Sequence, residues 1–127
     1  MPRKAKKARR LVVGDRTFLW KVRHVHRRLP DGRAADCRQT VGLRLVPGGG
    51  RLTVVFAEGP GRVLPGPYVA SSAGVGTVGG GDLNLHEPGT VRALLDEALA
   101  RGWRPEDRRG VELDGWTVLE AVAALRA

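Results

Sequence analysis

Two histidines separated by one residue are the side chains whose type and spacing most directly suggest chemistry. His24 and His26 lie in a stretch that alternates in polarity, so both imidazoles would lie on one side of a β-strand. Such a pair can bind zinc or another transition metal, but a site needs a third ligand. The candidates are all distant in sequence: His86, Cys37, Asp36 and Asp82. The plainer interpretation is a solvated strand end whose other end, residues 18–22, is core, and we expect no cofactor.

Cationic side chains offer a second kind of chemistry, the binding of phosphate or carboxylate groups. The outward face expected for two neighbouring strands is rich in them: Lys21, Arg23, Arg27, Arg38 and Arg44. Like charges on adjacent strands are unfavourable, and a polyanion or an acidic partner would relieve them. The alternative is a solvated basic face without a ligand. No aromatic residue shares this face, which argues against recognition of single strands by base stacking.

The start of the chain holds a further group of cations. Residues 1–10 contain no acidic residue and six basic ones: Arg3, Lys4, Lys6, Lys7, Arg9 and Arg10. They supply +6 of the net charge of +9, which leaves +3 for the rest of the chain. Such a segment contacts polyanions through counterion release, without sequence preference, or else only aids solubility. We expect it to be a flexible basic tail.

Motifs of enzyme active sites are weak in this chain. Residues 74–79 match G-x-G-x-x-G, but no helix is expected to begin inside the glycines, as dinucleotide binding requires. Ser71 and Ser72 lack the flanking glycines of a nucleophile elbow. Cys37 stands beside Arg38, which could lower its pKa, yet a single thiol in a strand is usually an apolar filler. We therefore expect no catalytic residues, and a domain that is not an enzyme.

The length and composition of the chain limit which kinds of protein it can be. The chain has 127 residues, the size of one domain, and is 42% hydrophobic, enough for a core. Its one cysteine cannot form an internal disulfide. The first residues lack the apolar segment of a signal peptide, and no apolar run approaches the ~18 residues of a membrane span. We expect a cytoplasmic protein that does not contact a membrane.

The elements that must position these residues follow from periodicity and turn signals. Strands are expected over 11–13, 17–28, 37–46 and 52–57, with turns at 14–15 and 30–32. Short turns between long strands favour an antiparallel meander. The glycine-rich segment 59–81 is ambiguous, with one more strand expected somewhere in 68–78. Short strands are also expected at 83–85 and 111–113.

Two amphipathic helices complete the expected fold. The first begins near Pro88 and ends at Gly102, with an apolar stripe at i, i+3, i+4, i+7 and i+8: Val91, Leu94, Leu95, Ala98 and Leu99. The second follows Asp114 as its N-cap and extends to Arg126. The sequence therefore predicts an α+β fold: a meander of about four to six strands with two C-terminal helices packed on one face, in a single domain over residues 11–127.

Three segments carry a resemblance: 18–26 (FLWKVRHVH), 83–103 (LNLHEPGTVRALLDEALARGW) and 113–119 (LDGWTVL). With them, residues 11–120 resemble a family of short actinomycete-type bacterial proteins with no assigned function. The resemblance implies that the tryptophans and the junction at residues 84–89 belong to a shared scaffold. It implies no functional residue, and the basic tail lies outside it.

These observations predict a small non-enzymatic domain that binds a polyanionic or acidic macromolecule, nucleic acid or protein, through the tail and the sheet face. One alternative is a small metal-dependent enzyme that uses His24 and His26 with His86. The other is a protein-interaction module of the immunity or antitoxin kind, which rests on analogy alone.

Overall fold

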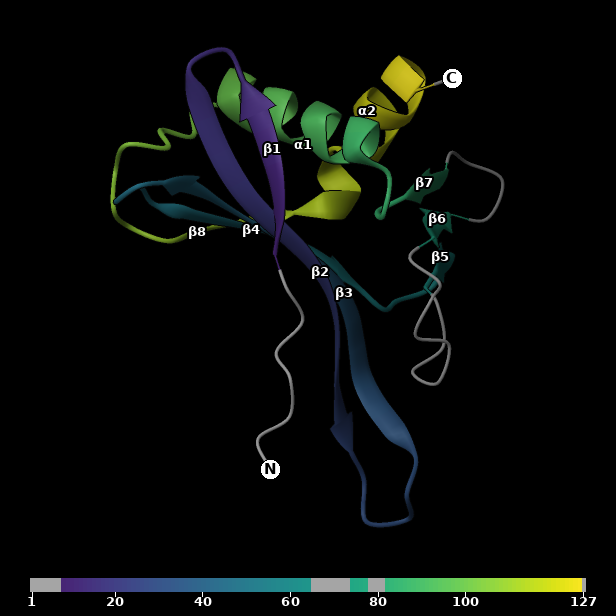
Figure 1. Cartoon of the computed structure of the whole chain (residues 1–127). Helices are drawn as coiled ribbons and strands as arrows, with labels where there is room; N and C mark the ends of the chain where they lie inside the picture. Colours follow the sequence, from purple (N-terminus) through teal and green to yellow (C-terminus); the bar gives the residue numbers. More distant parts are fainter. Residues whose placement is uncertain (1–7, 65–73, 78–81, 127) are drawn as a thin grey trace.

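The fold is an α+β arrangement of eight strands, one 3₁₀ turn and two helices, in a computed structural model that describes residues 8–64, 74–77 and 82–126 (Figure 1). The strands of the main sheet are β1 (Arg9–Val13), β2 (Arg16–Arg28), β3 (Ala34–Val46), β4 (Arg51–Ala57) and β8 (Val111–Asp114). A smaller sheet contains β5 (Arg62–Val63), β6 (Gly74–Thr77) and β7 (Asp82–Asn84). The helices are α1 (Pro88–Ala100) and α2 (Leu119–Arg126), with the 3₁₀ turn Gly115–Thr117 before α2.

The main sheet has the strand order β1-β2-β3-β4-β8. Its first four strands pair antiparallel with their neighbours in sequence, which confirms the expected meander. The last strand, β8, pairs parallel with β4, and this was not predicted. A parallel neighbour needs a crossover connection, and here the small sheet and α1 lie between β4 and β8 in sequence.

The small sheet settles part of the ambiguous glycine-rich segment. Its order is β5-β6-β7, with both pairs antiparallel. The strand expected within 68–78 is present as Gly74–Thr77, while residues 68–73 and 78 lie outside the described residues. The strand expected at 83–85 is Asp82–Asn84.

The alternation expected along β2 and β3 is present and divides the main sheet into an inner and an outer face. On β2, Phe18, Trp20 and Val22 are buried, whereas Lys21 and Arg23 are exposed. On β3 the buried positions are Gln39, Val41 and Leu43. One sheet face is therefore covered and the other is left with its charged residues.

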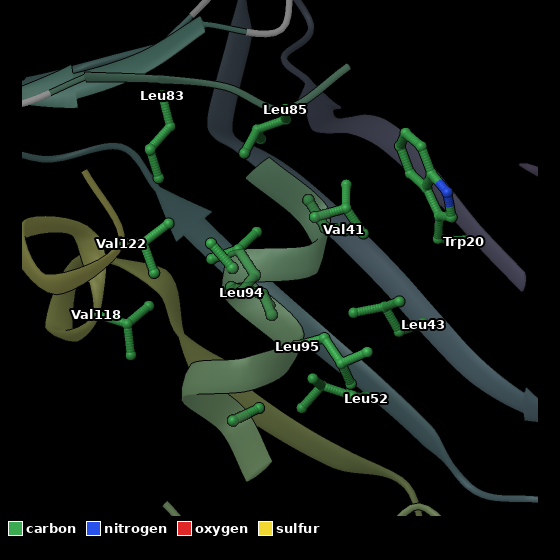
Figure 2. Packing of buried hydrophobic residues seen from close by; sticks show 14 of the residues in the cluster. Trp20, Val41, Leu43, Leu52, Leu83, Leu85, Leu94, Leu95, Val118 and Val122 are labelled. Carbon is green, nitrogen blue, oxygen red and sulfur yellow. The ribbon is translucent and has the colours of Figure 1, made fainter. Parts of the chain in front are cut away.

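The two helices cover the inner face and enclose the core with it (Figure 1). The stripe predicted for α1 is buried except for Leu99, which is half-buried. Figure 2 shows Leu95 directed toward Leu43 and Leu52 of the sheet, with Leu94 between the sheet and α2. No helix among the described residues is long and apolar enough to cross a membrane.

Helix boundaries follow local sequence signals, with one correction. Pro88 is the first residue of α1, and Gly102 beyond its end has φ +104°, the left-handed geometry expected there. Asp114 does act as a cap, but of the 3₁₀ turn: its Oδ1 accepts from the backbone N–H of Trp116 at 3.0 Å. The second helix therefore begins at Leu119 and not directly after Asp114.

The close approach of Gly115 to Phe56 gives a stability prediction. A Cβ at residue 115 would lie 2.5 Å from Cε1 and Cζ of Phe56, whose ring is fully buried and held edge-on against Trp116 at 5.2 Å. We expect Gly115→Ala to lower the free energy of unfolding by about 1–3 kcal/mol in urea denaturation. Gly110→Ala is the matched control, because its Cβ meets nothing within 4 Å. Equal stability of the two variants would show that the ring has room to move.

Candidate functional site

The outer face of the main sheet gathers cations from four consecutive strands. The register places Arg10 opposite Leu19, Leu19 opposite Arg44, and Arg44 opposite Arg51, so one row crosses β1 to β4. The next rows along the strands hold Lys21 and Arg23, and then Arg38 opposite Val25. We call this set the cationic face: Arg10, Lys21, Arg23, Arg38, Arg44 and Arg51. The structure thus brings together four of the five predicted strand cations and adds two more.

A hollow lies at the centre of the cationic face, where Gly42 stands between Lys21 on β2 and Thr53 on β4. Gly42 has no side chain to fill the outer surface, and a Cβ built there meets nothing within 4 Å. The hollow has a volume of about 210 Å³. Its rim includes four cations and two hydroxyl side chains: Lys21, Arg23, Arg44, Arg51, Thr40 and Thr53. We call it the Gly42 hollow.

The cations around the Gly42 hollow take part in none of the ion pairs that join described residues. Those pairs hold other arginines, such as Arg92 with Asp96 at 3.1 Å and Arg16 with Glu106 at 2.6 Å. Two acidic residues of β8 stand next to the face, Glu112 opposite Thr53 and Asp114 opposite Val55, so negative charge bounds the face on one side. Uncompensated like charges on neighbouring strands repel one another, and a bound anion would reduce that repulsion.

A second hollow, of about 460 Å³, lies between the end of α1 and β8, and two of its three arginines are already paired, Arg101 with Glu97 and Arg109 with Asp107. Asp107 accepts hydrogen bonds from the backbone N–H and the guanidinium of Arg109, at 3.1 and 3.3 Å. These bonds hold the pKa of the Asp107 carboxyl below its ordinary value. Because this carboxylate is already hydrogen-bonded and lies among cations, the hollow presents less free positive charge than the Gly42 hollow does.

Three further cations were predicted as binding residues, and each lies in a different place in the structure: Arg9, Arg10 and Arg27. Strand β1 begins at Arg9, so Arg9 and Arg10 belong to the sheet and not to the tail. Arg9 shares the inner face with Trp20: its guanidinium lies 4.6 Å from the Trp20 ring and donates to the His86 carbonyl at 2.9 Å. Only Arg10 joins the cationic face. Arg27 forms an exposed ion pair with Asp36 at 2.9 Å.

The remaining predicted cations, Arg3, Lys4, Lys6 and Lys7, lie outside the described residues.

The His-x-His pair lies on the inner side of β2, as the alternation predicted. The His24 and His26 rings are 5.5 Å apart, and Nδ1 of His24 donates to the Gln39 side-chain oxygen at 3.0 Å. The Nε2 atom of His24 and the Nδ1 atom of His26 are buried and have no hydrogen-bond partner among the described residues. Within the described ranges, no group of three His, Cys, Asp or Glu side chains is placed to hold a metal ion. Among these residues, the predicted metal site at His24 and His26 therefore has no third ligand, and His86 does not act as one.

The pKa of the Cys37 thiol is raised, whereas the neighbouring Arg38 had suggested a lowered pKa. Adjacent strand residues point to opposite faces, so Arg38 does not stabilise the thiolate. Burial raises the pKa of the Cys37 thiol, and the nearby carboxylates of Glu58 and Asp36 raise it further. Less thiolate is present near neutral pH than in a free thiol.

We therefore expect Cys37 to react with iodoacetamide more slowly in the folded protein than in urea between pH 7 and 8. Glu58→Gln removes one of the carboxylates that disfavour the thiolate and should speed the folded reaction. A folded thiol that reacts as fast as the unfolded one would contradict this assignment.

Two residues of the site are not indicated by the sequence patterns. Arg51 lies just before the predicted strand 52–57, although Arg51, Thr53 and Val55 alternate with the apolar residues that are buried. Gly42 lies on the predicted outward face, but the alternation does not indicate the hollow that it leaves. Comparison with protein-family models, with curated proteins and with solved structures finds no match to this chain, so the resemblance to actinomycete-type proteins stays a prediction.

Proposed function

We propose that this chain is a non-enzymatic domain that binds nucleic acid by its phosphate backbone, through the cationic face. The observation that carries the proposal is the Gly42 hollow, where Lys21, Arg44 and Arg51 converge from three strands without a carboxylate partner among the described residues. Neighbouring strands lie about 4.8 Å apart, Arg44 stands directly opposite Arg51, and Lys21 lies diagonally from Arg44, so the three cations form a compact array of charge. DNA matches such an array, because it carries one negative charge per ~1.7 Å of its axis.

The side chains of the face favour phosphate over an acidic protein. The core of a protein–protein interface is apolar and rich in aromatic residues. The outer side of the sheet carries aliphatic side chains only singly between polar ones: Val12, which is 61% exposed, Val25, which is 37% exposed, and the half-buried Leu19, Val46 and Val55. None of the aromatic side chains that the structure describes is exposed on this face to stack on a base, so contact with the backbone is favoured over recognition of unpaired bases.

The test separates the face from the tail. A labelled duplex DNA is titrated at increasing salt with the whole chain and with a chain that begins after residue 7. This deletion removes four cations and leaves β1 intact, since β1 begins at Arg9. We expect binding to persist, with the slope of log K against log salt reduced by no more than about 3.6.

Loss of all binding in the shortened chain would assign the activity to residues 1–7 and contradict the proposal. Binding that does not weaken with salt would contradict it as well, because release of counterions from phosphates is unavoidable in this mode. Retention of an acidic protein but of no nucleic acid would favour the protein partner instead.

A further inference from the structure

The hairpin of β2 and β3 extends beyond every other strand of the main sheet (Figure 1). On one side, β1 pairs with β2 only as far as Trp20. On the other side, β4 pairs with β3 as far as Arg38, and one further bond joins Glu58 N to the Cys37 carbonyl at 2.9 Å. Residues 26–36 therefore form a two-stranded ribbon that pairs with no other described strand. We call this ribbon the arm.

The arm contributes nothing to the hydrophobic core, since none of its side chains belongs to the buried cluster or packs against it. An isolated two-stranded hairpin is at best marginally stable in water. This one is held by local devices: the Leu29 N–H donates to the Arg33 carbonyl at 2.8 Å, and the Arg27–Asp36 ion pair links its two strands at 2.9 Å. An ordered element that does not stabilise the core is a candidate for contact with a partner.

The size of the arm fits one groove of one kind of nucleic acid. Five or six residues from His26 to the tip reach about 15–20 Å at the rise of a strand. The major groove of B-form DNA, ~12 Å wide, admits a two-stranded ribbon without deformation of the duplex, whereas the minor groove, ~6 Å wide, has to be widened or bent to take one. The major groove of A-form RNA is too deep and narrow to be read by side chains.

The side chains of the arm suit base edges more than phosphates. They include three arginines and two aspartates, a net charge of +1: Arg27, Arg28, Arg33, Asp31 and Asp36. Two of the arginines are held by exposed ion pairs, Arg27 with Asp36 at 2.9 Å and Arg33 with Asp31 at 2.6 Å, and exposed pairs of this kind exchange readily for other partners. Arginine pairs with guanine O6 and N7 in the major groove, and aspartate accepts from cytosine N4. Phosphate contacts would come from the cationic face, which the arm continues along β2 from Arg23 to Arg27.

We infer that the arm enters the major groove of duplex DNA while the cationic face holds the flanking phosphates. The inference rests on the proposed function for the phosphate contacts and goes beyond it by naming the partner as duplex DNA and the groove as the major one. The residues of β3 opposite Arg28 and Arg27 are Ala34 and Ala35, whose small side chains keep the ribbon narrow enough for a groove.

Protection of guanine N7 from methylation by dimethyl sulfate tests the inference, because N7 lies in the major groove. The whole chain is compared, on a saturated duplex, with a variant in which an Asn-Gly turn replaces residues 27–36, a turn suited to a two-residue hairpin. A second variant, Arg27→Gln with Arg28→Gln and Arg33→Gln, keeps the backbone of the arm. We expect the whole chain to reduce N7 methylation by about threefold or more, and both variants to bind DNA without that protection.

Equal protection by the variants, or binding of the whole chain without N7 protection, overturns the role of the arm and leaves the proposed function in place. Tighter binding of duplex RNA than of duplex DNA also overturns it. No binding by any of the three proteins overturns the proposed function first, and the arm with it. A change from dimer to monomer in the shortened variant, with unchanged N7 protection, assigns the arm to self-association instead.

Discussion

Replacing Lys21, Arg44 and Arg51 by glutamine is expected to weaken DNA binding by roughly 10- to 100-fold at 0.1 M salt. The three side chains surround the Gly42 hollow and take part in no ion pair between described residues, so their charge is free to act on a ligand. The slope of log K against log salt should fall by about 2.7, which is 0.9 for each phosphate that the variant no longer neutralises. A salt titration of labelled duplex DNA measures both quantities.

The matched control removes the same amount of charge elsewhere. The control positions are exposed and lie outside the cationic face: Arg104 and Arg108 in the connection to β8, which join no ion pair between described residues, and Arg92 on α1, which pairs with Asp96. Changing these three to glutamine should leave the affinity within about threefold of the parent, since only long-range attraction is reduced. If the two triple variants bind equally, net charge and not the face determines the affinity, and the assignment of the site is wrong.

Gly42→Val should strengthen the fold and weaken binding at the same time. A Cβ at residue 42 meets nothing within 4 Å, and the backbone at Gly42 is not in the left-handed region, so we expect a larger side chain to fit there. Valine is favoured over glycine in a strand, and we expect the free energy of unfolding to rise by roughly 0.5–1 kcal/mol. The branched side chain fills the hollow between Lys21 and Thr53, and the affinity for DNA should fall by about tenfold.

Opposite changes in stability and affinity are informative because a misfolded variant cannot produce them. Urea denaturation and the DNA titration are made on the same preparation. Gly42→Ala fills less of the hollow and should fall between the parent and Gly42→Val in both measurements. Unchanged affinity in the valine variant would mean that the ligand does not use the hollow, whatever the role of the surrounding cations.

Much of the main sheet was predictable because its local signals agree. Alternation along residues 17–28 and 37–46 identified the buried side of β2 and β3, since a strand with one covered face needs apolar side chains at every second position. Pro88 and Gly102 marked the limits of α1 for equally local reasons. The outward placement of Lys21, Arg23, Arg38 and Arg44 followed from the same periodicity.

What escaped prediction depends on contacts between distant residues. The parallel pairing of β8 with β4 is decided by the path of the chain over the sheet, which no short segment encodes. Arg9 turned to the inner face because β1 pairs in a register that places it opposite Trp20. The Gly42 hollow requires neighbours from β2 and β4 to form its rim, so a glycine in one strand did not reveal it.

Chemical-shift changes in an NMR titration with a short DNA duplex at low salt test the central claim most directly. The proposed interface predicts that the largest changes fall on the amides of Lys21, Gly42, Arg44 and Arg51, with further changes along the arm. Changes confined to α1 and α2, or to residues 1–7, would contradict the claim that the outer face of the sheet is where this protein binds its ligand.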